Sequence, residues 1–84
     1  YGANLSGLDL TGVSFTQDIS YAKFRDCIGF TAEQIVSAKD WNNIALTEAQ
    51  YDSMKTELAA SLPKGVSKKI FIKWGDTRTI YSSN

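Results

Sequence analysis

The chain has 84 residues, of which 43% are hydrophobic, 12% aromatic and 21% charged, and its formal net charge is zero. This composition is typical of an ordinary small globular domain, and it excludes a disordered chain and, because no apolar run is long enough, a membrane-spanning helix. The chain contains no histidine and one cysteine. The commonest general base and zinc ligand is therefore missing, and an intrachain disulfide is impossible.

The charges are distributed unevenly. Residues 1–62 contain four basic and eight acidic residues, whereas residues 63–84 contain five basic residues and one acidic residue. The basic end can steer a partner or pair with the acidic body of the chain. Because the chain starts at Tyr1, without methionine or a targeting segment, we expect a cut or matured end of a longer protein. The single cysteine is compatible with a reducing compartment, such as the cytoplasm or the destination of a translocated effector, and specifies neither.

A five-residue repeat runs through residues 3–26, with one unit shortened by one residue. A period of five fits neither the 3.6 of an amphipathic helix nor the 2.0 of a strand, and Gly7 and Gly12 give the chain places to turn. A large apolar residue recurs in each unit, usually with a smaller or second apolar residue two positions earlier. The large residues are Leu5, Leu10, Phe15, Ile19 and Phe24, and the earlier ones are Ala3, Leu8, Val13 and Ala22.

These units resemble those of the pentapeptide-repeat family, which read approximately Ala-Asp/Asn-Leu-x-x. The resemblance implies that residues 3–26 are the terminal coil of a right-handed, four-sided β-helix, a solenoid whose apolar residues point to its axis. It also implies a helical cap, because a Thr-x-x-Gln-Ile helix followed by Ala38-Lys39-Asp40-Trp41 is similar to the segment after such coils. One coil cannot bury its own axis, so other coils or another surface must stack on it. The alternative is a pair of short strands with glycine turns.

Two helices are predicted from nearly identical start signals. Thr31 and Thr47 are each followed three residues later by glutamine, which is the pattern of a capping box with an apolar staple around it. The first helix should run from Ala32 to Asp40 or Trp41, with Ile35 and Ala38 inward, and stop at Asn42-Asn43. The second should run from Glu48 to Leu62 before Pro63, with one apolar face. That face consists of Tyr51, Met54, Leu58 and Leu62.

A hairpin is predicted for residues 64–84. The segments 69–74 and 78–81 are rich in β-branched and aromatic residues, and Gly75-Asp76-Thr77 can supply the turn. A three-residue loop would place Trp74 opposite Arg78, whereas a two-residue loop would place Lys73 opposite Arg78, which is a like-charge pair. We prefer the first register. The hairpin must pack one face on the helices, because a lone hairpin is marginal in water.

Catalytic chemistry is not indicated. Cys27 is expected to pack as a small apolar residue, and the exposed positions predicted for Asp9, Asp18 and Asp26 favour solvated surface charges. Trp41 and Trp74 are either core anchors or exposed binding anchors, and the small size of the chain favours the core. We find no phosphate loop, metal-ligand cluster or nucleophile paired with a base, so we expect no cofactor, no metal and no enzyme activity in these residues.

The candidate interaction site is the basic hairpin, where cationic residues alternate with aromatic ones. Such a pattern can hold phosphates and stack bases. The simpler interpretation is that lysines on a solvent-facing strand discourage edge-to-edge aggregation. The candidate residues are Lys69, Phe71, Lys73, Trp74 and Arg78.

The sequence therefore predicts an α+β unit with three parts: a pentapeptide-repeat coil over 1–29, a two-helix cap over 30–63 and a basic β-hairpin over 64–84. The expected function is a bacterial, non-catalytic protein-interaction or structural module at the C-terminal end of a repeat region. Alternatives are a nucleic-acid-binding module acting through the hairpin, or the non-catalytic part of an effector enzyme. The DNA mimicry of some family members is not carried over, because it needs a long acidic coil. A protein partner is expected, a membrane is not, and the oligomeric state stays open.

Overall fold

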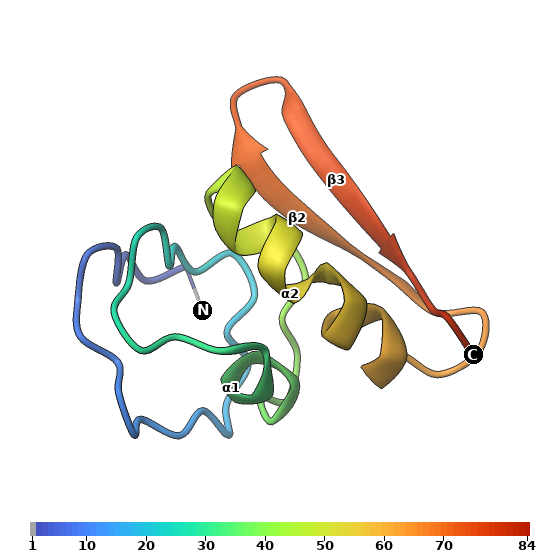
Figure 1. The fold of residues 1–84 in the computed structure, drawn as a ribbon, viewed down its shortest axis with the longest axis horizontal. Helices are drawn as coiled ribbons and strands as arrows, with labels where there is room; N and C mark the ends of the chain where they lie inside the picture. Colours follow the sequence, from blue (N-terminus) through green and yellow to red (C-terminus); the bar gives the residue numbers. More distant parts are fainter. Residues whose placement is uncertain (1) are drawn as a thin grey trace.

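One three-stranded sheet organises the second half of the chain in the computed structural model, which describes residues 2–84. β1 (Ile44–Ala45) pairs in parallel with β2 (Ser67–Lys73), and β2 pairs antiparallel with β3 (Asp76–Tyr81). The strand order β1-β2-β3 leaves β3 at one edge of the sheet. In Figure 1 the β2–β3 hairpin extends away from the N-terminal segment as a long twisted ribbon.

The hairpin exists as predicted, but its turn and register differ from the prediction. β2 ends at Lys73 and β3 starts at Asp76, so the loop is Trp74-Gly75, with Gly75 at φ +81°. An irregularity between Phe71 and Lys73 shifts the pairing and sets Lys73 opposite Asp76. This register replaces both predicted alternatives, because it brings opposite charges together across the strands and uses glycine where the turn needs a positive φ.

Both helices start where the capping boxes predict. α1 (Ala32–Val36) is capped by Thr31 and Gln34, and α2 (Glu48–Ser61) is capped by Thr47 and Gln50. In each box the threonine side chain accepts from the backbone N–H of the glutamine, and the glutamine side chain accepts from the N–H of the threonine. The buried residues Met54, Leu58 and Leu62 confirm the inward face of α2, with Tyr51 partly buried.

α1 is shorter than predicted. It ends at Val36, before the predicted end at Asp40 or Trp41. After it, the backbone N–H of Lys39 donates to the Gln17 carbonyl, and Asp40 forms an isolated bridge with Asp18. These long-range contacts pull the chain out of helical geometry, and local periodicity does not report them.

The predicted coil of a pentapeptide-repeat β-helix is wrong, and residues 2–84 contain no solenoid. Residues 2–29 include no strand; they run as turns with isolated parallel bridges, such as Asn4 with Lys23. Lys23 in turn bridges Ala45, at a different separation along the chain, so equal repeats do not build this segment. Figure 1 shows its open, irregular path. The two helices are accordingly part of a small α+β fold rather than the cap of a repeat region.

The five-residue pattern predicts burial only in part. Among its large positions Leu10, Ile19 and Phe24 are buried, but Leu8 and Val13, assigned to the same coil axis, are exposed. A positive φ at Tyr21 and at Asp26, in addition to the glycines, bends the segment differently from a regular coil. The buried residues of this segment instead join one core with α1, α2 and the sheet. At its centre the rings of Phe24 and Phe30 stack with centroids 4.5 Å apart.

Side-chain hydrogen bonds tie the irregular segment to the helices and the sheet. Gln34 Nε2 donates to the carbonyls of Leu10 and Val13, each at 2.8 Å, and Gln50 Nε2 donates to the Phe24 carbonyl at 2.8 Å. The two capping glutamines therefore have a second role, which the capping pattern alone does not reveal.

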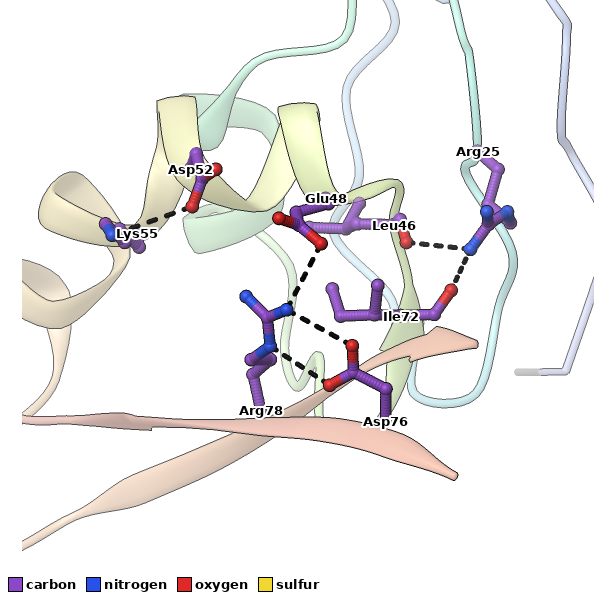
Figure 2. Close-up of polar contacts among 8 residues, drawn as sticks. All are labelled: Arg25, Leu46, Glu48, Asp52, Lys55, Ile72, Asp76 and Arg78. Carbon is purple, nitrogen blue, oxygen red and sulfur yellow. Dashed lines mark hydrogen bonds and ion pairs between the residues drawn. The ribbon is translucent and has the colours of Figure 1, made fainter. Parts of the chain in front are cut away.

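A guanidinium makes a similar tie. Arg25 donates to the Leu46 carbonyl at 3.0 Å and also to the Ile72 carbonyl, as Figure 2 shows. A single partly buried side chain thus joins residues 2–29 to the chain beside β1 and to β2.

No helix within residues 2–84 has the length and apolarity to cross a membrane.

Candidate functional site

The β2–β3 hairpin has two different faces. Ile70, Ile72 and Ile80 are buried in the core, on the side covered by α2. Because side chains alternate along a strand, Lys69 and Phe71 point to the opposite side, which we call the outer face. Lys69 is exposed and Phe71 is partly buried. The outer face therefore presents a cation beside an aromatic ring.

The outer face continues past β1 into the N-terminal segment. Phe71 pairs with Ala45, and Ala45 bridges Lys23, so these three positions form one row across the sheet. Ala45 is small, and a shallow hollow of about 220 Å³ lies in this region. We call it the outer-face hollow. It is lined by Tyr21, Lys23, Asn43, Ala45 and Phe71.

The lysines of the outer face have no carboxylate partners. Between the residues that the structure describes, no ion pair involves Lys23 or Lys69, and both side chains are exposed. Their positive charge is therefore available to a ligand, in contrast to the charges on the opposite face.

The tip of the hairpin adds a second exposed group. Trp74 is 94% exposed and Lys73 beside it is also exposed. Trp41, by contrast, is 4% exposed and lies in the core. The expectation of core packing is thus confirmed for Trp41 and wrong for Trp74, because Trp74 occupies the loop itself and cannot reach the core.

Arg78 does not belong to this site. Its guanidinium lies on the α2 side of the sheet (Figure 2). The Nε atom lies 3.0 Å from Asp76 Oδ1, and the Nη2 atom lies 3.2 Å from Glu48 Oε2. It also lies over the ring of Tyr51, 5.4 Å from the centroid. The hydrogen bond to Asp76 raises the pKa of Arg78 and lowers that of Asp76. Arg78 is therefore a positioning residue between β3 and α2.

Lys68 is also engaged on the inner side. Its ammonium group hydrogen-bonds Asp40 and lies 5.5 Å from the centroid of the Trp41 ring. This hydrogen bond is the main cause that holds the pKa of Asp40 below its ordinary value. Of the basic residues in the hairpin, Lys68 and Arg78 thus serve the fold, whereas Lys69 and Lys73 remain at the surface.

The structure adds two residues that the sequence interpretation did not include. Tyr21 and Lys23 line the same hollow as Phe71, although they are far from it in the sequence. Tyr21-x-Lys23 repeats the alternation of aromatic and basic residues seen in β2. That signal was present in the sequence, but only the bridge between Lys23 and Ala45 brings the two segments together.

The residues considered for catalysis have structural contacts. Asp9 and Asp18 accept the backbone N–H groups of Thr11 and Ser20, at 3.0 and 2.8 Å. Hydrogen bonds to these neighbours lower the pKa of both carboxyls. Both are therefore carboxylates at neutral pH that stabilise local turns.

Cys27 packs against the core, and its Sγ donates to the Leu5 carbonyl at 3.0 Å. Within residues 2–84, no group of three or more acidic or cysteine side chains is arranged to hold a metal ion. The outer face, with its exposed and unpaired lysines beside the hollow, is therefore the candidate binding surface.

Comparison with protein families, with curated proteins and with solved structures gives no match to this chain.

Proposed function

We propose that this chain is a non-catalytic interaction module whose outer face binds an acidic segment of a partner protein. The observation that carries this proposal is the pair of exposed, unpaired lysines, Lys23 and Lys69, beside the outer-face hollow. Charge complementarity of this kind directs association and sets the orientation of a partner. The partly buried ring of Phe71 offers apolar contact next to the two cations.

The distribution of carboxylates supports an acidic ligand. Asp76 and Glu48 lie on the α2 side of the sheet, where Arg78 engages them. The outer-face positions of β3, Thr77 and Thr79, are neutral. An acidic segment on the outer face would therefore meet cations without a nearby like charge.

Single-stranded nucleic acid is the second candidate ligand. The exposed indole of Trp74 and the aromatic wall of the hollow favour it, because bases stack on aromatic side chains among cations. We rank it second because the net charge of the chain is zero and only a few cations remain unpaired, whereas nucleic-acid-binding domains normally carry a clear positive excess.

Direct binding to two probes tests the proposal. A fluorescein-labelled peptide of alternating glutamate and proline, whose prolines prevent it from pairing as a β-strand, and an oligothymidylate of equal length are titrated with the 84-residue chain at several salt concentrations. We expect the peptide to bind, with an affinity that falls as salt rises. Tighter binding of the oligothymidylate would favour the second candidate, and no binding of either probe would contradict both.

Charge-reversal variants locate the site. Lys23→Glu and Lys69→Glu should each weaken peptide binding about fivefold, because each replaces an attraction by a repulsion at the hollow. Lys64→Glu is the matched control, since Lys64 is equally exposed and lies in the turn at the other end of the hairpin. An equal loss in the control would mean that only net charge matters, and the outer face would not be the site.

A further inference from the structure

A second surface lies at the free edge of the sheet. In antiparallel pairing, the backbone N–H and C=O of successive residues point alternately toward and away from the neighbouring strand. Leu46 N–H donates to the Phe71 carbonyl, so the backbone groups of Phe71 point to β1 and those of its neighbour Ile70 point to β3. Ile70 pairs with Arg78. The backbone groups of Arg78 therefore point to β2.

The same alternation defines the groups that point outward. Ser82 N–H donates to the Val66 carbonyl, so the backbone groups of Ser82 point to the β2 side, as those of Arg78 and Ile80 do. The N–H and C=O groups of Thr77, Thr79 and Tyr81 consequently point to the open edge. No further strand of the sheet covers them in the described chain. The edge presents a row of alternating donors and acceptors.

A groove runs beside this edge, between β3 and α2. Its volume is about 470 Å³. The α2 wall contains the small residues Ala59 and Ala60, which leave room for side chains of a ligand. The lining residues are Tyr51, Lys55, Thr56, Ala59, Ala60, Thr79, Ile80, Tyr81 and Ser83.

The chain end fixes the spacing of the two walls. Ser83 N–H donates to the Ala59 carbonyl at 3.2 Å, and Asn84 Nδ2 donates to the carbonyls of Ala60 and Leu62, at 3.2 and 2.6 Å. These bonds engage carbonyls at the C-terminal end of α2, where the last carbonyls of a helix lack the regular intrahelical partner. They also attach the end of β3 to α2, so the groove is formed before a ligand arrives.

The edge strand lacks proline, lysine and a bulge, which commonly prevent strand addition, although it contains the charged residues Asp76 and Arg78 on the α2 side. β3 contains no proline and no lysine, and the irregularity of the hairpin lies in β2 instead. Natural edge strands are commonly blunted by such features. Lys55 is the one charged residue among those lining the groove, and its ammonium group lies 3.6 Å from the carboxylate of Asp52 in an exposed ion pair (Figure 2).

We propose that the edge of β3 accepts an extended, acidic and apolar peptide segment of a partner protein as an added strand. Its backbone would pair with Thr77, Thr79 and Tyr81, and such pairing requires the bound segment to be extended. Alternate side chains would enter the groove, where Ala59 and Ala60 leave space for apolar groups. A carboxylate among them would replace Asp52 as the partner of Lys55, because an exposed ion pair within one helix is weak. This edge adjoins the outer face, to which Thr77 and Thr79 also belong, but the proposal does not depend on binding at the outer-face hollow.

Selection from a peptide library supplies the probe. Random heptapeptides displayed on phage are selected against the 84-residue chain, and the most enriched sequence is synthesised. We expect apolar residues at alternate positions with an aspartate or glutamate among them. In an NMR titration the amides of Thr77, Thr79 and Tyr81 should shift and exchange more slowly with solvent. Failure to enrich any peptide, or shifts confined to other surfaces, would overturn the proposal.

A backbone substitution tests the pairing itself. Thr79→Pro removes an outward-pointing N–H without removing a β2–β3 hydrogen bond, a position at which edge strands tolerate proline. It should weaken the selected peptide about tenfold, whereas Thr79→Val, which keeps the N–H, should change the affinity less than about twofold. Equal affinities for the two variants would overturn the added-strand geometry.

A groove-filling variant covers the case in which Thr79→Pro does not fold. Ala60 is exposed, so Ala60→Trp should leave the core intact and block the groove, with a loss of about tenfold or more. Wild-type affinity in this variant would overturn the proposal. Sedimentation of the chain without peptide tests the other occupant: a dimer that Thr79→Pro dissociates would assign the edge to a second copy and overturn the peptide proposal.

Discussion

Residues 2–29 and the β2–β3 hairpin contribute to one core by different means. The hairpin has a backbone ladder that is interrupted once, between Phe71 and Lys73, and an apolar face of isoleucines on α2. Residues 2–29 have isolated bridges and tight turns, and side chains of Gln34, Gln50 and Arg25 attach them to the remainder. A region without regular structure can therefore be positioned by a few long-range bonds, and here it supplies two of the five residues that line the outer-face hollow.

The largest expected effect tests whether the irregular region shares the core. Phe24→Ala should lower the free energy of unfolding by about 3–5 kcal/mol, because a fully buried ring stacked on Phe30 is removed. Urea unfolding followed by circular dichroism measures this loss. Leu8→Ala, at a half-exposed position of the same segment, should change it by less than about 0.5 kcal/mol. A loss below about 1 kcal/mol for Phe24→Ala would show that residues 2–29 are not coupled to the core.

The next effect concerns the turns of the irregular region. Gly29 has φ +67°, and a Cβ there would lie 2.1 Å from Thr11 Oγ1, whereas Gly7, at φ +79°, has open space around it. Gly29→Ala should therefore cost roughly 1–3 kcal/mol more than Gly7→Ala, since the first adds a clash to the strain that both share. Thermal unfolding of the two variants measures the difference. Equal costs would mean that Thr11 moves freely and that this turn is not tightly packed.

A smaller effect separates the two roles of a capping glutamine. Gln34→Glu keeps the oxygen that caps α1 but loses the amide that donates to the Leu10 and Val13 carbonyls. It should lower the free energy of unfolding by about 1–2 kcal/mol. The exposed neighbour serves as control, because Glu33→Gln should change stability by less than about 0.5 kcal/mol. A stability unchanged by Gln34→Glu would limit this residue to its capping role.

The smallest effect is a dependence of stability on pH. Lys68 lowers the pKa of Asp40 from its ordinary 3.8, so the unfolded state binds a proton more readily than the folded state does. The stabilisation is complete above pH 3.8 and is lost as the pH falls through the lower pKa of the folded protein. Asp40→Asn should reduce the acid sensitivity of unfolding below the ordinary aspartate pKa of 3.8. An unchanged pH profile would show that the Lys68 contact does not stabilise the fold.

The sequence predicted the elements that are determined locally. The capping boxes located the starts of α1 and α2, because their hydrogen bonds join residues only three positions apart. The hairpin was also predicted, but its turn at Trp74-Gly75 was not, since the register depends on contacts of Asp76 and Arg78 across the sheet and with α2.

Features that depend on distant residues were not predictable in this way. The five-residue period led to a β-helix, yet a period does not determine whether neighbouring segments stack in equal repeats. Likewise, the local alternation of basic and aromatic residues predicts one site that contains Lys69, Phe71, Lys73, Trp74 and Arg78. This pattern does not reveal that Arg78 forms an ion pair with Glu48 on the other side of the sheet. Tyr21 and Lys23 were missed for the same reason, because only the folded chain brings them to the hollow.

An NMR titration with the glutamate–proline peptide tests the proposed function most directly, because it locates the bound peptide residue by residue and this peptide cannot pair as an added strand. We expect the largest shifts at the amides of Lys23, Ala45, Lys69 and Phe71, around the outer-face hollow, with smaller shifts at Trp74 and none along α2. Lys69→Glu should suppress these shifts, and Lys64→Glu should leave them intact. Shifts centred on α2 or spread evenly over all lysines would contradict a binding site on the outer face.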